Sequence, residues 1–361
     1  MLSYPIILMA LRSATLSLHA LTASATSTSP PPPQFSLVAD YSGKTFFDGF
    51  TAFTDADPTN GMVTYVDMAT AAEKRYIGFV QNGITESLNA YIGVDYTSVT
   101  AKRDSVRLTS KATFDVGTIV VMDVFHAPSA FGSWPALWLL GDVSGGVWPY
   151  SNGAEIDVLE FVHNSSVNAV TLHTGPGCTV QNTRNLFQGE LQDPNCNAGT
   201  PLPGTTGCSI QATHQAVSRG RTLATAGEPF NAQHGGVYVT VWTADGISAY
   251  LFSRSALPGD LMAGTPDPTR WTTQPLAHFD GGCDFANEFS TMRIITDQTF
   301  CGDWAGKAEI WESSGAQAAT GTATCEEYVM NNPAAFRHAN FEIASIRVFS
   351  NNGKMPLVER K

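Results

Sequence analysis

The stretch Glu155-Ile-Asp-Val-Leu-Glu160 places three carboxylates among aliphatic residues. Its β-branched and aliphatic members favour a strand, in which side chains alternate between two faces. Glu155 and Asp157 then share one face, whereas Glu160 falls on the other unless the strand gains a residue. A β-bulge adds such a residue and re-aims a side chain. We therefore expect a bulge between Asp157 and Glu160, which turns the three carboxylates into one groove and Ile156 and Leu159 toward the core.

Strand signals dominate the rest of the chain beyond about residue 35. They are apolar runs or period-two alternations bounded by Gly, Pro and Asn. They cover residues 118–125, 136–140, 167–173, 237–243, 247–252, 292–296 and 343–349. Asp245-Gly246 joins two of them as a favoured hairpin turn, and residues 326–331 form one short helix candidate that stops before Pro333. The pattern predicts an all-β sandwich with long loops.

Charge and composition exclude several classes of protein. The 361 residues hold 20 Lys and Arg against 32 Asp and Glu, a formal net charge of −12. Such a surface repels phosphate backbones, so no nucleic-acid partner is expected. No stretch approaches the length of apolar sequence that spans a bilayer, so no membrane span is expected. Length alone suggests two domains, but the composition shifts only after the leader, which favours one domain over residues 35–357.

The first 34 residues differ from the rest, because they hold one arginine and no acidic residue. An apolar start followed by Ala23-Ser24-Ala25 is typical of a secretory signal peptide. We predict a signal peptide over residues 1–25, a Ser/Thr/Pro-rich spacer over 26–34, and a secreted protein, extracellular or held at the cell wall. The alternative is a disordered leader.

The cysteines fit an oxidising compartment. There are six, and none has the Cys-x-x-Cys spacing of zinc or thioredoxin-type sites. They are Cys178, Cys196, Cys208, Cys283, Cys301 and Cys325. Three fall in each of two stretches, so either one disulfide links the stretches or two thiols stay free.

Asn164-Ser-Ser166 is the one N-glycosylation sequon in the sequence. The alternative is that these residues form an ordinary polar turn.

The acidic strand indicates a reaction class. Two carboxyl groups about 5–5.5 Å apart across a glycosidic bond are the arrangement of retaining glycosidases, one as nucleophile and one as acid/base. A third acid between them adds like charge, which raises a pKa and helps to keep the acid protonated. The alternative is a solvated acidic edge strand.

At this point the chain resembles glycoside hydrolase family 16, in particular the secreted fungal laminarinase-like endo-1,3(4)-β-glucanases. The acidic strand matches that family's E-x-D-x-x-E signature in its bulged form, and further matches extend over residues 35–349. They are Phe46-Phe-Asp-Gly-Phe50, Asp57-Pro58, Gly61, Tyr65-Val-Asp67, Ser133-Trp-Pro-Ala-Leu-Trp138, His173-Thr174, Cys301-Gly-Asp-Trp-Ala-Gly306, Cys325–Val329 and Asn332-Pro333.

The resemblance implies a concanavalin A-like jelly roll, with two curved antiparallel sheets and a substrate cleft on the concave face. It implies Glu155 as nucleophile, Glu160 as general acid/base and Asp157 as the assisting carboxylate. His173 would hydrogen-bond within the site. Trp138, Trp148 and Trp304 would line the glucan subsites, since tryptophan offers sugars a flat apolar face, although Trp138 equally suits core packing.

Function follows as an expectation with alternatives. The first is a retaining endo-β-glucanase acting on 1,3- or mixed 1,3/1,4-glucan as a monomer, with no metal or organic cofactor. A structural calcium ion, which some members of the family carry, stays open. The second is a cell-wall transglycosylase with the same site, and the third a non-catalytic, lectin-like glucan-binding protein. Residues 175–233, which hold three of the cysteines, are expected to form loops that flank the cleft and influence substrate choice.

Overall fold

The structure of the protein is a computed structural model that describes residues 34–141, 153–181, 186–198, 207–351 and 357–358. These residues belong to one compact unit, Pro33–Lys361. The predicted signal peptide, residues 1–25, residues 26–33 of the predicted spacer, and Trp148 lie outside the described residues.

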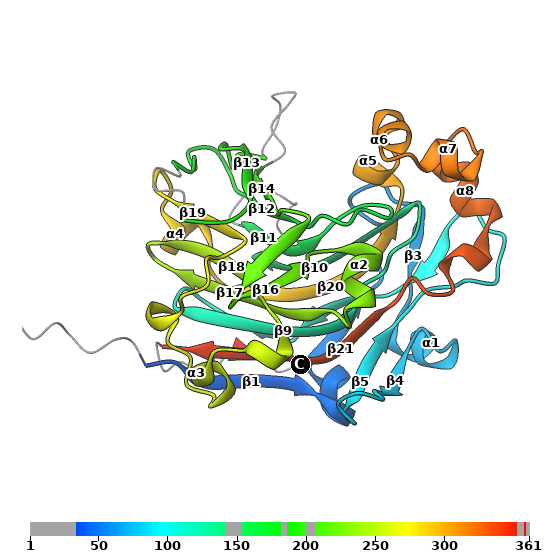
Figure 1. The fold of residues 1–361 in the computed structure, drawn as a ribbon. Coiled ribbons are helices and arrows are strands. Elements are labelled where there is room, and N and C mark those ends of the chain that lie inside the picture. The colour runs from blue at the N-terminus through cyan, green and yellow to red at the C-terminus, as the bar shows by residue number, and fades with distance from the viewer. Residues whose placement is uncertain (1–33, 142–152, 182–185, 199–206, 352–356, 359–361) are drawn as a thin grey trace, which may run out of the picture. The chain divides into compact units, whose positions relative to one another are not determined.

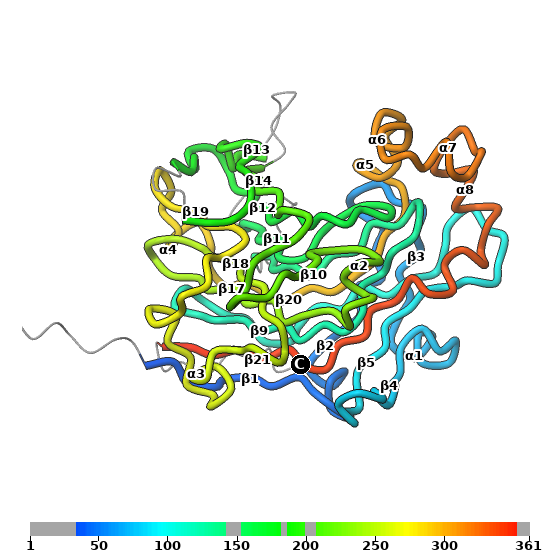
Figure 2. The backbone as a smooth tube through the Cα atoms, viewed as in Figure 1, coloured from blue at the N-terminus to red at the C-terminus, as the bar shows by residue number. Residues whose placement is uncertain are grey.

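Two eight-stranded sheets make up most of the fold (Figure 1). The first runs in the order β19-β18-β17-β9-β21-β5-β4, with β1 also paired to β21. Its strands are β1 (Ser36–Ser42), β4 (Ile77–Gln81), β5 (Leu88–Ile92), β9 (Thr118–His126), β17 (Gly236–Thr243), β18 (Gly246–Phe252), β19 (Ala277–Asp280) and β21 (Phe341–Ser350). Figure 2 shows β1, from the start of the described chain, beside β21 near its end. All pairs in this sheet are antiparallel.

The second sheet runs in the order β13-β14-β12-β11-β10-β20-β7-β2 and is also antiparallel. Its strands are β2 (Phe50–Phe53), β7 (Arg107–Ser110), β10 (Ser133–Gly141), β11 (Glu155–Glu160), β12 (Ala169–His173), β13 (Glu190–Asp193), β14 (Cys208–Gln211) and β20 (Met292–Phe300). The predicted all-β jelly roll of two antiparallel sheets is confirmed.

The remaining elements are short. Three two-stranded pairs are β3 (Val63–Tyr65) with β6 (Arg103–Ser105), β8 (Ala112–Thr113) with β22 (Leu357–Val358), and β15 (Gln215–Ser218) with β16 (Arg221–Ala224). The α-helices are α1 (Met68–Glu73), α2 (Gly227–Ala232), α3 (Gly259–Met262), α4 (Phe285–Glu288), α5 (Gly302–Ala305), α6 (Ala308–Ser313), α7 (Ala316–Thr320) and α8 (Cys325–Asn331). The 3-10 helices are η1 (Gly43–Gly49), η2 (Arg254–Ala256), η3 (Pro268–Arg270) and η4 (Pro333–Phe336). None of the helices in the described ranges has both the length and the apolar composition needed to cross a bilayer.

Burial on both faces explains the unbroken apolar run of β9. Val120, Met122 and Val124 point into the main core between the sheets. Ile119 and Val121 point outward into a second cluster, which the segment around α3 covers. In a strand that is buried on both faces, apolar residues follow one another in the sequence instead of alternating with polar ones.

Helices α5–α8 gather around a third cluster next to β3 (Figure 1). Trp311 of α6 and Cys325 of α8 are buried there beside Tyr65 of β3. The Cys301–Cys325 disulfide ties α8 to the end of β20. The predicted helix at 326–331 is confirmed as α8, whose N-cap Thr324 accepts a hydrogen bond from the Glu327 amide. This ordered region fixes the end of β20, which borders the cleft described below.

Candidate active site

Strand β11 carries the bulge that the sequence predicts. Asp157 pairs with Thr171 and Glu160 with Ala169, so β11 takes three steps where β12 takes two. Ile156, Val158 and Leu159 are all fully buried in the main core. Two consecutive residues, Val158 and Leu159, thus enter the core, and this extra inward step turns Glu160 back to the face of Asp157.

The three carboxylates line a cleft of about 410 Å³. Glu155, Asp157 and Glu160 come from β11, and the rest of the lining comes from β2, β7, β10, β20, the loop after β2 and Gly153 just before β11. The lining residues are Phe53, Asp57, Pro58, Thr59, Arg107, Thr109, Trp134, Ala136, Trp138, Leu140, Gly141, Gly153, Glu155, Asp157, Glu160, Arg293, Ile295, Asp297 and Thr299. Carboxyl groups along one wall of a cleft suit acid/base and nucleophilic chemistry on a bound polymer.

Glu160 has the environment of a general acid. Burial raises the pKa of Glu160 to about 7, against the opposing effect of a hydrogen bond from Trp134. The Trp134 indole Nε1 donates that bond to Oε1 at 2.8 Å. The Glu160 amide in turn donates to Asn168 Oδ1 at 2.8 Å, which fixes the backbone at the bulge. A carboxyl group with a pKa near 7 can hold a proton for a leaving group at neutral pH.

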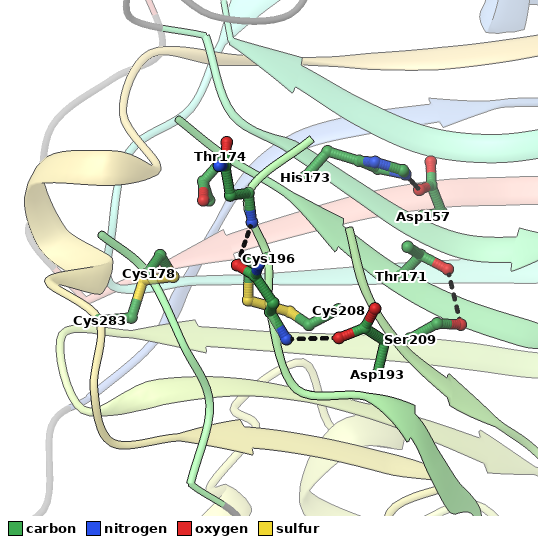
Figure 3. The surroundings of a disulfide bond; sticks show 12 residues. Asp157, Thr171, His173, Thr174, Cys178, Asp193, Cys196, Cys208, Ser209 and Cys283 are labelled. Carbon is green, nitrogen blue, oxygen red and sulfur yellow. Dashed lines mark hydrogen bonds and ion pairs between the residues drawn. A yellow bond between two sulfur atoms is a disulfide. The ribbon is translucent and has the colours of Figure 1, made fainter. Parts of the chain in front are cut away.

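Asp157 lies between the two glutamates and against His173. His173 Nε2 lies 3.0 Å from Asp157 Oδ2, and Figure 3 shows the ring pointing toward this carboxyl group. Burial and then the charge of Glu160 raise the pKa of Asp157 well above its ordinary value, while a hydrogen bond with Glu155 opposes the rise. The structure thus places His173 in an ion-pair contact with Asp157, and its predicted hydrogen bond within the site stays a prediction.

A possible set of metal ligands lies at this end of β11, namely Glu155, Asp157 and His173. One ligand atom from each lies within 4.8 Å of the other two. The same spacing follows from neighbouring positions on β11 and β12, because Glu155 pairs directly with His173. The spacing alone therefore assigns no metal, and hydrolysis by two carboxyl groups requires none.

Trp138 is both a packed and a cleft-lining residue. Its side chain is only 7% exposed and packs with Ala136, Ile295 and Leu140. It nevertheless borders the cleft, and Nε1 donates to Asp297 Oδ1 at 2.7 Å. Trp138 therefore packs within this cluster and lines the cleft at the same time, and its contact with a glucan stays a prediction.

Sequence reasoning missed a polar group on this floor. Asp297 of β20 accepts hydrogen bonds from Trp138 and from the Tyr65 hydroxyl, the latter at 2.8 Å. The Arg107 guanidinium lies over the rings of Phe53 and Trp138, 4.5 and 4.8 Å from their centroids. The signal available was an alternation of Arg293, Ile295, Asp297 and Thr299 along β20, all of which line the cleft.

The other predicted aromatic residues have different outcomes. Trp304, on α5, meets the Trp134 ring edge to face at 5.6 Å and joins the site through it. Trp134 itself received no role from the sequence. Trp148 lies outside the described residues.

The sequence favoured loops over residues 175–233, but the structure shows regular elements among them. They add β13 and β14 to the sheet beyond β12, and also form β15, β16 and α2. Thr171 of β12 and Ser209 of β14 are in hydroxyl contact at 3.1 Å, which continues the face of Asp157 outward (Figure 3). The expectation was wrong because these strands are short and polar, which hides them among turn residues.

The disulfides resolve the open pairing. Cys178–Cys283 links the two cysteine stretches, Cys196–Cys208 lies within the first and Cys301–Cys325 within the second. The first of the two alternatives is therefore correct, and the described chain holds no free cysteine. Figure 3 shows the Cys196–Cys208 bond beside the end of β12, where Cys208 pairs with Leu172 and the Cys196 carbonyl accepts a hydrogen bond from the Thr174 amide.

Comparison with known proteins gives a consistent result. A family model described as "XgeA-like, catalytic GH16 domain" matches residues 50–349. A probable glycosidase of Schizosaccharomyces pombe is 36% identical over 317 residues, which cover 87% of this chain and 69% of that protein. A probable endo-1,3(4)-β-glucanase of Aspergillus clavatus is 37% identical over 323 residues, but the match spans only 46% of its length.

Solved structures agree with the fold. Laminarinase 16A of Phanerochaete chrysosporium, with β-glucans in donor and acceptor sites, is 35% identical with a TM-score of 0.75. An elongating GH family 16 β-1,3-glucosyltransferase is 33% identical with a TM-score of 0.73. Each match covers 88% of this chain and 100% of the other.

Proposed function

The chain belongs to glycoside hydrolase family 16, and we propose that it is a retaining endo-β-glucanase that hydrolyses 1,3- or mixed 1,3/1,4-β-glucan. The observation that carries the proposal is the bulged strand β11, which sets Glu155, Asp157 and Glu160 along one cleft. The relatives named as endo-1,3(4)-β-glucanases and laminarinase support the substrate class. A neutral glucan also suits a chain of net charge −12, because it is not repelled.

The reaction takes two steps. In the first, Glu155 attacks the anomeric carbon and forms a covalent glycosyl ester, while Glu160 gives its proton to the leaving glycosidic oxygen. In the second, Glu160, now a carboxylate, takes a proton from water as that water attacks the anomeric carbon and releases Glu155. The configuration at the anomeric carbon is inverted twice and so retained.

Asp157 and Trp134 assist without bonding to the sugar. The hydrogen bond between Asp157 and Glu155 needs a proton on one of the two carboxyl groups. Burial and the charge of Glu160 raise the pKa of Asp157, and a less charged Asp157 repels a carboxylate on the nucleophile Glu155 less strongly. Trp134 holds the acid/base in place through its 2.8 Å hydrogen bond.

The first experiment measures released reducing ends from laminarin and lichenan. Wild type is compared with Glu155→Gln and with Glu73→Gln, an exposed glutamate on α1 that serves as a matched control. We expect Glu155→Gln to lose activity by several orders of magnitude and the control to keep it. An unimpaired Glu155→Gln would contradict the proposal.

Azide then separates the roles of the two glutamates. With an activated β-glucoside donor, Glu155→Gly plus azide should form the α-glycosyl azide by direct displacement. Glu160→Gly plus azide should form the β-glycosyl azide, because azide intercepts the covalent intermediate on Glu155. The opposite pattern would exchange the two assignments.

Transglycosylation is the second candidate, favoured by the similarity to the elongating glucosyltransferase. The same glycosyl-enzyme would be captured by a sugar hydroxyl group instead of water. Incubation with a single laminari-oligosaccharide decides between them, because products longer than the starting chain require transfer.

An extracellular site of action is also part of the proposal. The three disulfides require an oxidising compartment, and the predicted leader would deliver the chain there. Expression of the full chain in a fungal host, followed by N-terminal sequencing of protein from the medium, tests secretion and cleavage near Ala25.

A further inference from the structure

Asp297 shares a row of the sheet with the acid/base. Ala136 of β10 pairs with Glu160 on one side and with Asp297 on the other. The two acids are therefore two strands apart, about 10 Å between backbones, with Ala136 between them in the register. Both side chains border the same cleft.

The carboxyl group of Asp297 is already occupied. Oδ1 accepts from Trp138 Nε1 at 2.7 Å and Oδ2 from the Tyr65 hydroxyl at 2.8 Å. Asp297 is only 7% exposed, and burial raises its pKa, whereas Arg107 from the neighbouring strand and the hydrogen bonds from Trp138 and Tyr65 favour its charged form. A carboxylate with both oxygens in use is poorly placed to bind sugar, but its charge still acts on the groups around it.

We propose that Asp297 is a positioning residue of the cleft, which anchors the Trp138 indole and keeps a fixed negative charge in the row of Glu160. The inference rests on the proposed function, because it assigns the purpose of this charge to the acid/base step. Asp297 of β20 thus joins the three carboxyl groups of the E-x-D-x-x-E strand β11, from the opposite side of β10.

The charges around Glu160 and Asp297 determine how strongly the charge of Asp297 changes the pKa of Glu160. Glu160 faces Glu155 and Asp157 on its own strand, His173 on β12 and Asp297 on β20, of which Glu155 and Asp297 favour its protonated form and His173 opposes it. Asp297 faces Arg107 on β7, Tyr65 on β3, Asp57 in the loop after β2 and Glu160 on β11. Arg107 screens the charge only in part, because it also lies between two aromatic rings. At this distance a unit charge in a partly buried site shifts a carboxyl group by about half a pH unit or more.

The test separates charge from hydrogen bonding. In Asp297→Asn, the amide oxygen can still accept from Trp138 and the amide nitrogen can donate to Tyr65, so only the charge is lost. Tyr65→Phe is the matched control, because it removes one hydrogen bond and keeps the charge. We expect the alkaline limb of kcat/KM on laminarin to move to lower pH by about half a unit or more in Asp297→Asn, and to stay in place in Tyr65→Phe.

A second readout needs no substrate. Trp134 donates directly to Glu160, so its fluorescence should titrate with Glu160, and the difference from Trp134→Phe isolates that signal. The midpoint should fall in Asp297→Asn. Equal midpoints in wild type and Asp297→Asn, or an equal shift in Tyr65→Phe, would overturn the inference. Absence of glucan hydrolysis by wild type would instead refute the proposed function and leave this titration valid.

A modification site follows independently from the turn after β11. Asn164 is exposed there, within the sequon Asn164-Ser-Ser166. Ser165 N–H closes the turn onto the Val162 carbonyl at 3.2 Å. In the described part of the chain, Asn164 Nδ2 donates no hydrogen bond. We propose that Asn164 carries an N-linked glycan in the secreted protein.

Mass spectrometry decides this second proposal. Protein secreted from a yeast host is treated with peptide N-glycosidase in heavy-oxygen water, which converts a glycosylated Asn164 to labelled Asp. We expect the label in wild type and in Ser166→Thr, and its loss in Ser166→Ala. A secreted wild type with unmodified Asn164 would overturn the proposal.

Discussion

The indole nitrogen of Trp134 donates a hydrogen bond of 2.8 Å to Oε1 of Glu160. The two residues sit on neighbouring strands, β10 and β11, at the point where the bulge has re-aimed Glu160. The bond favours the charged carboxylate, whereas burial favours the neutral acid, and burial is the larger effect. The balance leaves the pKa of Glu160 at about 7.

Removal of this bond should raise the pKa of Glu160 further. Trp134→Phe keeps an aromatic ring but loses the N–H donor, so the charged form becomes less stable. The alkaline limb of kcat/KM on laminarin should move up by about half to one pH unit. Trp271→Phe, on the outer face of the first sheet, is the matched control. A limb that moves down, or that moves equally in both variants, would contradict the prediction.

Burial of Glu160 should cost stability at neutral pH. Its pKa is about 7 in the folded protein against an ordinary value of 4.5. Folding is therefore favoured by the protonated form, and this contribution is lost as the pH rises from about 4.5 to about 7. Glu160→Gln should raise the free energy of unfolding at pH 8 by roughly 3 kcal/mol and change it little near pH 4.

Urea unfolding at the two pH values measures this difference directly. The exposed substitution Glu73→Gln provides the baseline. Equal effects of Glu160→Gln at both pH values would show that its carboxyl group is not destabilised by burial.

The disulfides should differ in how much they contribute to the free energy of unfolding. Cys178–Cys283 closes a loop of 105 residues and Cys196–Cys208 one of 12. On chain-entropy grounds, replacing the first pair by serine should lower the free energy of unfolding by about 4–5 kcal/mol and the second by about 3 kcal/mol. Denaturant unfolding of the two double variants checks the order. A larger loss from the short loop would show that local contacts outweigh loop closure.

The parts of the site that sequence reasoning predicted are local ones. Glu155, Asp157 and Glu160 lie within six residues, so strand periodicity predicted the bulge that β11 shows, once all three carboxylates were taken to face one groove. A disulfide between the two cysteine stretches was one of two alternatives, and only the packing of distant segments could identify Cys178 and Cys283 as the linking pair.

The parts that it missed depend on register between distant strands. Trp138 and Asp297 are 159 residues apart and meet because β10 pairs with β20. Tyr65 reaches Asp297 from a separate two-stranded pair. The hydrophobic periodicity of each segment carries no information about which distant strand it will pair with. The fold class could be predicted from strand composition, whereas the order of strands that builds the cleft floor could not.

Trp304 offers a way to separate sugar binding from acid/base catalysis. It lies on α5, half-buried, with its ring edge to face against Trp134 at 5.6 Å. If its exposed surface receives a sugar ring, Trp304→Ala removes binding that is equal in the ground and transition states. KM for laminarin should then rise roughly 5- to 30-fold, equivalent to about 1–2 kcal/mol, with kcat little changed. Trp304→Phe should recover most of the loss. A fall in kcat and a moved alkaline limb would instead show that Trp304 acts by holding Trp134 against Glu160.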